Sequence, residues 1–495
     1  MKSYMNSYDV IVIGGGLLGC FAARNLTRYN LKIALLEKRE DLCTGISRAN
    51  TAVVYAGCDT KPNTLKASMC VKSAKNFAQL CNELGVRYSA CGSVMVSFGE
   101  YGAEVLRRKM NLGIKNGVRG MRSLLRGEIL ELEPNIAGNA HTGLFVPDTG
   151  TVMPWELCLA AAENAAHNGA EIMLNTEVTE IRHGKTVSGY EVHTNNGTFF
   201  TRGIVNCAGL AADSILEMIS EPTVRILPSA CDYFILDTKA GGHIRHVIFH
   251  EPEEYGKGLT LVPTVDGNIL IGSTERQGDD FGTSDAGLNK LRELVSQVMP
   301  TLPLEYIIRS FGAVRPNPYL LRKSKHSGYT AETKSVNDFC VIESPDKTAI
   351  SLVGIKTPGL TCANELGIYA ADKMAASLGT DANSAFDPKC LPSARLSYMS
   401  FEERKSFIQK ENPAYNKIIC NCRGITEGEI IDAIQRFPGA TTLDGVKRRT
   451  GAGSGCCQGS SCARDIIEIL AQELKRTPEE ITKDGEDSYF FSSNT

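Results

Sequence analysis

Four cysteines near the C-terminus form two close pairs, Cys420-x-Cys422 and Cys457-x4-Cys462. Thiolates are ligands for zinc and for iron–sulfur clusters, and either kind of site can take four of them. A small helical module between the two pairs would fix the distance from one pair to the other. The spacing alone does not separate a structural zinc site from an iron–sulfur cluster, so both interpretations stay open at this point.

A second set of residues with chemical meaning lies near the start of the chain, in the glycine-rich segment 14–19. The apolar run 9–13 before it predicts a buried strand, and the stretch after it predicts a helix. Gly14 would permit a tight turn, Gly16 would let the backbone approach a pyrophosphate, and Gly19 would let the helix pack on the strand.

The next predicted strand, residues 32–36, ends at Glu37, where a carboxylate can accept a hydrogen bond from a ribose hydroxyl. The helix N-terminus would supply N–H groups and a positive dipole end to the phosphates. The elements therefore follow in the order that a dinucleotide-binding unit requires: strand, loop, helix, strand and acid. A dinucleotide site at one end and a thiolate site at the other suggest electron transfer.

Apolar periodicity indicates the elements that must position these residues. We expect helices over residues 64–84 and 155–167, and strands over 171–178 and 201–207. Residues 226–271 alternate apolar and polar side chains between turn signals, which predicts an antiparallel sheet that covers a substrate. The sequence thus predicts an α/β fold, with a Rossmann-like unit interleaved with an antiparallel-sheet substrate domain.

The C-terminal part of the chain differs in character. Residues 381–413 indicate a polar linker that contains a charged helix over 401–410. Beyond it the sequence predicts a small helical domain, in which Thr426 caps one short helix and residues 441–444 open a second.

The composition favours a globular enzyme. The chain has 495 residues and a formal net charge of −3, which gives no reason to expect nucleic acid as a partner. No apolar run approaches the ~18 residues of a membrane-spanning helix, and no secretory pattern precedes the first strand. Seventeen cysteines, an odd number scattered along the chain, do not indicate a disulfide framework. We expect a cytoplasmic protein, with peripheral membrane association left open.

Beyond these patterns, residues 8–378 resemble the FAD-dependent oxidoreductases of the D-amino-acid oxidase superfamily. The most similar branch holds sn-glycerol-3-phosphate dehydrogenases and L-2-hydroxyglutarate oxidases. Besides the glycine loop, the segments that carry the resemblance are 47–57 (SRANTAVVYAG), 206–213 (NCAGLAAD), 257–268 (KGLTLVPTVDGN) and 354–361 (GIKTPGLT).

The resemblance implies that the dinucleotide is FAD. The implied FAD-site residues are Gly14, Gly16, Gly19, Glu37, Ser47, Asn50, Thr51, Val178, Ala208, Gly209, Lys356, Gly359, Leu360 and Thr361. The expected domains are an FAD-binding domain (1–90, 145–225 and 325–380), a substrate domain (91–144 and 226–324), a linker with a helical tether (381–413), a cluster domain (414–475) and a tail (476–495).

Residues 411–475 resemble the bacterioferritin-associated ferredoxin domain, a 2Fe–2S binder that is often fused to such flavoproteins. The segments that carry this second resemblance are 419–422 (ICNC), 426–430 (TEGEI), 443–450 (LDGVKRRT) and 457–462 (CQGSSC). The resemblance favours a 2Fe–2S cluster over zinc. Its implied ligands are Cys420, Cys422, Cys457 and Cys462.

The chain also departs from the pattern of its relatives. Many relatives carry His at the position of Tyr55, beside the flavin, and a Glu–Ser pair that begins where Lys356 stands. Lys356 would therefore bring a positive charge toward the reduced flavin. An arginine of the cluster loop is replaced by Cys456, a rival ligand, although the x4 spacing to Cys462 favours Cys457.

Arg315 stands where relatives carry an arginine near the flavin. A guanidinium offers two parallel N–H donors to a carboxylate or phosphate, so Arg315 is the expected anchor for an anionic substrate. Alcohol oxidation moves a hydride to the flavin while a base removes the hydroxyl proton. The candidate bases are His250 and Tyr55, and neither has a spacing argument behind it.

The resemblance therefore implies an FAD-dependent dehydrogenase of glycerol 3-phosphate or a similar small anionic 2-hydroxy compound. Its electrons would pass through the 2Fe–2S centre to a partner flavoprotein or another acceptor. The alternatives are an L-2-hydroxyglutarate-type oxidase or dehydrogenase, an amino- or imino-acid dehydrogenase, and a non-catalytic flavin and iron–sulfur redox partner. Fold analogy does not choose among these substrates.

Overall fold

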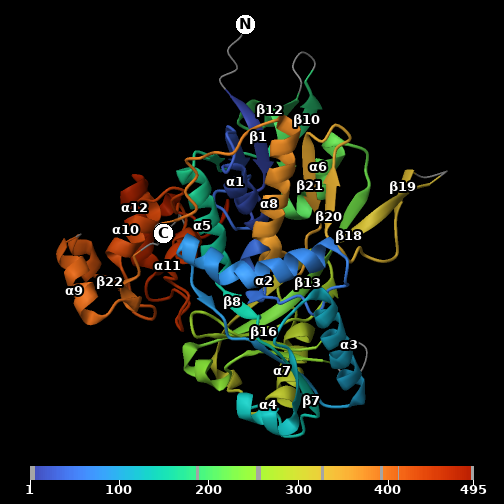
Figure 1. Cartoon of the computed structure of the whole chain (residues 1–495). Helices are drawn as coiled ribbons and strands as arrows, with labels where there is room; N and C mark the ends of the chain where they lie inside the picture. The colour runs from blue at the N-terminus through green and yellow to red at the C-terminus, as the bar shows by residue number, and fades with distance from the viewer. Residues whose placement is uncertain are drawn as a thin grey trace.

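A computed structural model describes residues 6–184, 189–251, 258–324, 328–390, 394–410 and 412–491. Figure 1 shows two large sheets, one above the other, with a small helical body beside them. The helices are α1 (Leu17–Leu26), α2 (Leu65–Leu84), α3 (Glu100–Asn116), α4 (Arg126–Leu132), α5 (Pro154–His167), α6 (Ala212–Ile219), α7 (Asp285–Val298), α8 (Gly359–Leu378), α9 (Phe401–Lys410), α10 (Glu427–Gln435), α11 (Leu443–Thr450) and α12 (Ala463–Leu474).

The first sheet has eight strands within the described residues. These are β10 (Val178–His183), β11 (Tyr190–Thr194), β12 (Gly197–Asn206), β1 (Ser7–Ile13), β2 (Ile33–Leu36) and β9 (Glu171–Met173), with β21 (Ala349–Val353) and β20 (Cys340–Glu343) beside β12. Its centre is parallel: β1 pairs with β12 and β2, β2 pairs with β9, and β12 pairs with β21. The predicted Rossmann-like core is therefore present.

Both faces of this sheet are covered, as the continuous apolar run of β1 requires. Val10 and Val12 point into a core that α1, α5 and α8 close, whereas Ile11 and Ile13 point into a second core beneath α6. The alternation follows from the two-residue period of a strand. The carboxyl end of β1 is thereby fixed at the glycine loop.

The second sheet has ten strands among the described residues and is mostly antiparallel. Its members are β19 (Gly328–Ala331), β18 (Ile307–Ser324), β13 (Val224–Leu236), β16 (Ile269–Gly272), β15 (Thr260–Pro263), β14 (Val247–His250), β5 (Ser93–Ser97), β7 (Thr142–Val146), β6 (Arg122–Leu125) and β17 (Arg276–Gln277). Phe234 packs toward α7, while Tyr233 faces the opposite side, toward Tyr55. The side that carries Tyr233 borders the site described below.

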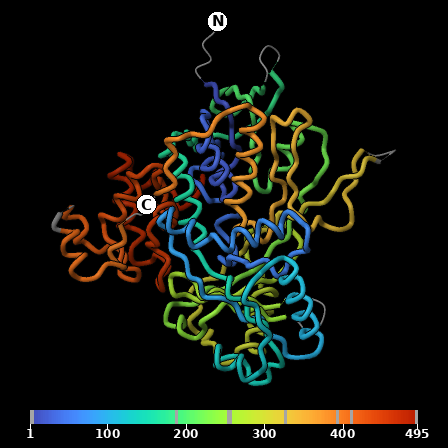
Figure 2. The backbone as a smooth tube through the Cα atoms, in the orientation of Figure 1, coloured from blue at the N-terminus to red at the C-terminus, as the bar shows by residue number. Residues whose placement is uncertain are grey.

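Two small sheets complete the fold. One is a three-stranded sheet in the order β3 (Val53–Val54), β8 (Gly150–Val152) and β4 (Tyr88–Ser89). In the other, β22 (Ile418–Cys420) pairs with β23 (Ile425–Thr426). The C-terminal body of α10, α11 and α12 has its own apolar core and lies beside α5 (Figure 2). Thr426 caps α10, where its side chain and that of Glu429 form a reciprocal capping box.

Most predicted elements are confirmed, with one correction. The single strand expected over 171–178 is wrong, because the chain breaks into β9 and β10 at Asn175, which has φ of 51°. The side chains of Asn195 and Asn196 donate hydrogen bonds to the Asn175 carbonyl and hold this break.

Lys257, at the start of one segment that carries the family resemblance, lies outside the described residues. Among those described, no helix has the length and apolar character needed to cross a membrane.

Candidate functional site

A cavity of about 510 Å³ lies where the carboxyl end of β1 meets β13 and β18 of the second sheet. Its walls come from the glycine loop, the segments after β2, the turn after β12, and the loop before α8. Predicted site residues on its lining are Gly14, Gly16, Glu37, Ser47, Asn50, Thr51, Tyr55, Ala208, Gly209, Arg315, Lys356, Gly359 and Leu360. The structure thus gathers residues that lie more than 300 positions apart in the sequence.

The glycine loop has the shape that a pyrophosphate needs. Gly14 has φ of 104°, and a Cβ there would come within 2.6 Å of the Cys207 carbonyl oxygen. Gly19 is not on the lining, but a Cβ on it would lie 1.8 Å from the Gly14 carbonyl oxygen, so it permits α1 to pack against the loop. The N-terminus of α1 therefore reaches the cavity with N–H groups and a positive dipole end.

Glu37 ends β2 and is fixed at the cavity wall. Its carboxylate accepts hydrogen bonds from the backbone N–H groups of Gly15, at 2.6 Å, and Arg39, at 2.9 Å. Burial raises the pKa of Glu37, and these two N–H donors oppose that effect. A carboxylate has about four lone-pair sites, so Glu37 retains acceptor capacity for a ribose hydroxyl.

Arg315 and Lys356 place two positive charges on the lining of the same cavity. Arg315 lies on β18, and Lys356 lies in the loop before α8, where its Nζ donates to Ser335 Oγ at 2.7 Å. Burial, together with the neighbouring charge of Arg315, lowers the pKa of Lys356. Two neighbouring cations favour a ligand that carries two negative charges.

The two candidate bases lie in different surroundings. Tyr55 is on the lining, and its backbone N–H donates to Thr361 Oγ1 at 3.0 Å. Thr361 is not on the lining itself but holds the backbone of Tyr55 in place. Burial raises the pKa of the Tyr55 phenol, so at neutral pH it is a hydroxyl donor rather than a base. His250 is not on the lining; its ring packs against Phe98, with the ring centroids 5.6 Å apart.

Val178 is also away from the cavity, because it begins β10 and pairs with Thr194 of β11. The structure therefore does not bring Val178 or His250 together with the other predicted site residues. Strand alternation accounts for His250: the preceding Phe249 lines an adjoining cavity of about 290 Å³, so the next side chain points to the opposite face. Tyr55 lines both cavities.

The predicted cluster ligands meet at one end of the C-terminal body. Cys420 ends β22 and Cys462 is the N-cap of α12, and the thiols of these two buried residues are hydrogen-bonded to each other. Cys422 Sγ lies 3.5 Å from Cys456 Sγ and 3.6 Å from Cys457 Sγ. A Cβ on Gly455 would approach Cys422 Cβ to 2.4 Å, so the glycine-rich loop is what lets the chain close around the thiols.

The spacing of the thiols is compatible with shared metal ligation. Two thiolates bound tetrahedrally at about 2.3 Å lie about 3.8 Å apart, close to the distances from Cys422 Sγ to its two neighbours. Within the described part of the chain, no group of three or more His, Cys, Asp or Glu side chains is arranged so that it could hold a metal ion. A hydrogen bond with Cys462 lowers the pKa of the Cys420 thiol to about 6, and a backbone hydrogen bond with Ser461 lowers that of Cys457 to about 7. The pKa of the other thiol in each pair is raised: that of Cys462 by its hydrogen bond with Cys420, and that of Cys422 to about 11, where a backbone hydrogen bond with Cys457 is outweighed by the Cys456 side chain and burial. Each pair therefore holds one thiol that ionises near neutral pH.

Comparison with known proteins agrees with both sites. The model of the family described as FAD dependent oxidoreductase matches residues 9–373. The chain belongs to this family. The model of the BFD-like [2Fe-2S] binding domain matches residues 418–472. FAD and a 2Fe–2S cluster are therefore the cofactors of this flavoprotein.

Several relatives extend the comparison. A glycerol 3-phosphate dehydrogenase of Caloramator mitchellensis is 38% identical over 495 residues, which cover 99% of each chain. A glycerol 3-phosphate oxidase of Mycoplasma pneumoniae is 30% identical over 374 residues, covering 72% of this chain and 92% of that protein. The solved structure of dithionite-reduced L-alpha-glycerophosphate oxidase from Mycoplasma pneumoniae with FAD bound has a TM-score of 0.70 and 26% identity, covering 78% of this chain and 100% of that chain.

Sequence reasoning missed two parts of the site. Asp484 and Gly485, from the tail, line the larger cavity, and Asp59, Lys61 and Lys66 line the adjoining one. The tail carries no motif that points to a nucleotide, and its position follows only from packing of the C-terminal body. Asp59, Lys61 and Lys66 precede or begin α2, which periodicity marks only as an ordinary core helix.

Proposed function

We propose that this flavoprotein is a dehydrogenase that oxidises glycerol 3-phosphate to dihydroxyacetone phosphate and passes the electrons on through its 2Fe–2S centre. The observation that carries the proposal is the similarity to a glycerol 3-phosphate dehydrogenase over 99% of both chains, which includes the cluster domain. The two cations on the cavity lining support it, because a phosphate monoester near neutral pH carries close to two negative charges.

Three residues on the lining have a proposed task in catalysis. FAD, when bound, would supply the hydride acceptor for the substrate C–H group, and the hydroxyl proton would leave to water in the cavity. Arg315 would hold two phosphate oxygens with its planar fork, and Lys356 would add a second charge at the same group. Tyr55, kept protonated by burial, would donate a hydrogen bond to a substrate oxygen and so orient the carbon to be oxidised.

The electron acceptor is proposed to be a partner, such as a second flavoprotein, rather than oxygen. The exposed thiol of Cys422 puts the cluster end of the C-terminal body at the molecular surface, where a partner can approach. We propose a cytoplasmic location, and peripheral contact with a membrane is compatible with such a partner.

A dye-linked steady-state assay tests the substrate. Glycerol 3-phosphate, L-2-hydroxyglutarate, L-lactate and proline should be compared side by side, with the dye as acceptor. We expect glycerol 3-phosphate to give the highest kcat/KM, at least tenfold above the others, because only it combines the phosphate with a short carbon chain. Preference for L-2-hydroxyglutarate or for proline would replace the proposal by the 2-hydroxyacid or imino-acid alternative.

Anaerobic bleaching of the flavin absorbance separates an enzyme from a non-catalytic redox protein. Reduction by any of these substrates within the turnover time supports an enzyme. If none of the four bleaches the flavin, this flavoprotein is instead a redox partner of another protein.

A further inference from the structure

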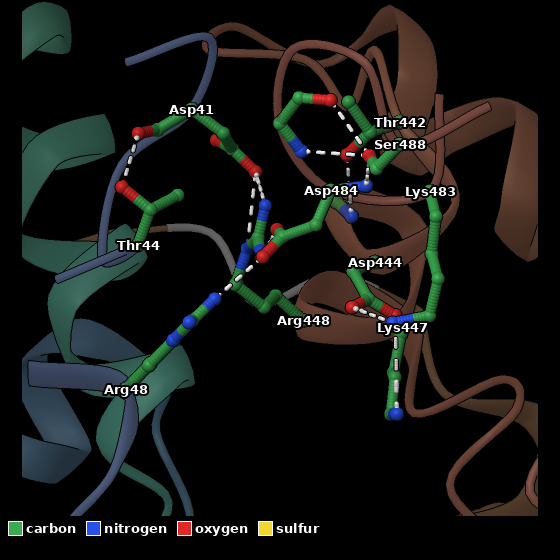
Figure 3. Close-up of polar contacts among 12 residues, drawn as sticks. Asp41, Thr44, Arg48, Thr442, Asp444, Lys447, Arg448, Lys483, Asp484 and Ser488 are labelled. Atoms are coloured by element: carbon green, nitrogen blue, oxygen red, sulfur yellow. Dashed lines mark hydrogen bonds and ion pairs between the residues drawn. The ribbon is translucent and has the colours of Figure 1, made fainter. Parts of the chain in front are cut away.

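A buried group of charges joins the FAD-binding part of the chain to the C-terminal body (Figure 3). Asp41, in the segment after β2, accepts hydrogen bonds from Arg448 at 2.8 Å and from Arg449 at 2.7 Å, both on α11. The side chain of Asp41 has no exposed surface, and those of the two arginines are 5% and 6% exposed. Residues 37–40, directly before Asp41, line the FAD cavity. The contact therefore lies immediately behind the cofactor site.

Asp484 extends this group into the cavity itself. Its two carboxylate oxygens bind different partners: Arg448 Nη1 at 2.8 Å on the C-terminal body, and Arg48 Nη1 at 2.5 Å on the FAD-binding part. Asp484, Gly485 and Arg48 all line the cavity. Figure 3 shows the Asp484 carboxylate between the two arginine side chains, facing the segment of Asp41.

The segment that carries Asp484, residues 482–489, is a defined turn, named here the C-terminal turn. The Ser488 hydroxyl oxygen accepts hydrogen bonds from the N–H groups of Asp484 and Gly485, at 3.0 and 3.1 Å. The carbonyl oxygens of Thr482 and Lys483 accept from the first N–H groups of α11, at 3.2 and 2.7 Å. The adjacent Ile481 is fully buried in the core of the C-terminal body. The turn is thus held on α11 at a fixed position.

We propose that the C-terminal turn is a wall of the FAD site and that FAD binding and docking of the C-terminal body stabilise each other. The turn lies outside both matched regions, residues 9–373 and 418–472, so neither family pattern includes it. Asp484 acts as a positioning residue: it holds Arg48, whose carbonyl oxygen also accepts from the Trp155 indole at 2.9 Å. The side chain of Arg48 is 36% exposed and lines the cavity, where it would face the anionic dinucleotide.

Coupling follows from linkage. A ligand that binds a wall formed from two parts of the chain stabilises their association, and the association in turn strengthens binding of the ligand by the same factor. The inference rests on FAD binding and not on the substrate, so it stands or falls independently of glycerol 3-phosphate oxidation.

Two matched variants of the same turn test the wall. D484N keeps the size of the side chain and removes the charge that binds Arg48 and Arg448, whereas D487N removes a charge from an exposed residue that is not on the lining. Asn also tolerates the positive φ of Asp487. After dilution of the holoprotein, with release followed by the rise of flavin fluorescence, we expect D484N to lose FAD about tenfold faster and D487N to match the wild type.

A slower release of FAD from D484N would be equally informative. If Asp484 only repelled the FAD phosphates, D484N would release FAD more slowly, and that result would overturn the proposal. An unchanged release rate in D484N would overturn it too. Iron content should equal that of the wild type in both variants.

Hydrogen exchange on the full-length wild-type protein tests the coupling without a variant. The amides of Asp484 and Gly485 report on closure of the turn, since both donate to Ser488. We expect exchange across residues 482–489 to rise several-fold once FAD is removed, while the buried amides of α12 keep their rates. Equal exchange in this turn with and without FAD would contradict the coupling.

Discussion

Arg315 and Lys356 define the site at the scale of single residues. The Arg315 guanidinium is planar and can donate two parallel hydrogen bonds, whereas the Lys356 ammonium is a compact charge. Burial and the nearby charge of Arg315 lower the pKa of Lys356. Tyr55 and His250 were candidates for one role, but the structure gives them different surroundings: a buried phenol on the lining and an imidazole on the far side of β14. Which side of a strand a residue faces therefore decides which candidate can contact a substrate.

Replacing Arg315 by Lys should keep the charge and lose the paired N–H donors. We expect kcat/KM for the true substrate to fall by roughly one to two orders of magnitude, with flavin content near normal. Arg322→Lys is the control, because Arg322 lies on the same strand with its side chain 80% exposed and bound to Glu332. Equal activity of the Arg315 variant and the wild type would remove Arg315 from the site.

The buried Asp41 predicts how docking responds to pH. Burial alone would raise the pKa of Asp41, but Arg449 and Arg448 hold it at about 2, below the usual 3.8. Because the folded pKa lies below the unfolded one, the stabilisation is complete above about pH 5 and is lost progressively as the pH falls from there through 2. Asp41→Asn should lower the thermal midpoint by the same amount at pH 5 and pH 8. A difference that disappears at pH 5 would contradict this assignment.

At the scale of elements, local patterns predicted most of what positions the FAD site. The order β1, glycine loop, α1, β2 and Glu37 follows from apolar periodicity and from glycines that close contacts require. The break at Asn175 was not predictable, because it depends on amide side chains about 20 residues away. Local patterns thus indicate which elements form, while contacts between distant segments decide where a strand ends.

The glycine loop gives a direct test of the cofactor site. A Cβ on Gly16 would already lie 3.0 Å from Ser47 Oγ, and Gly16→Asp would add a carboxylate where the pyrophosphate approaches the N-terminus of α1. The purified variant should lack the flavin absorbance. Gly127→Asp is the control, because Gly127 lies in the first turn of α4 with open space around it. This variant should bind FAD at wild-type stoichiometry. Full flavin content in the Gly16 variant would mean that the loop does not hold the pyrophosphate.

The two thiols beside Cys422 allow a test of the cluster ligands. Cys456 and Cys457 lie at nearly the same distance from Cys422, but the pKa of Cys457 is lowered to about 7, chiefly by a backbone hydrogen bond with Ser461. We expect Cys422→Ser and Cys457→Ser to abolish the rhombic paramagnetic signal of the reduced cluster, while Cys456→Ser retains it. If only the Cys456 variant loses the signal, Cys456 and not Cys457 is the cluster ligand.

At the scale of the whole molecule, the C-terminal body docks through charges of opposite sign. Acidic residues of the flavoprotein part meet arginines of the C-terminal body in the pairs Glu163–Arg436, Asp266–Arg423 and Asp41–Arg448. Glu156 also pairs with Arg395 of the linker. No sequence pattern signals such pairs, since Asp41 and Arg448 are 407 positions apart. The cluster motif could be predicted, but its place against α5 and the FAD cavity could not.

The central claim is that electrons from glycerol 3-phosphate pass through FAD to the 2Fe–2S centre. The most direct measurement is anaerobic mixing of the purified holoprotein with glycerol 3-phosphate, followed by optical absorbance and by paramagnetic resonance of the frozen sample. The account predicts rapid bleaching of the flavin absorbance together with the rhombic signal of a reduced cluster. Cys422→Ser protein should bleach without that signal. A flavin that stays oxidised with glycerol 3-phosphate, yet is bleached by another of the candidate substrates, would contradict the account.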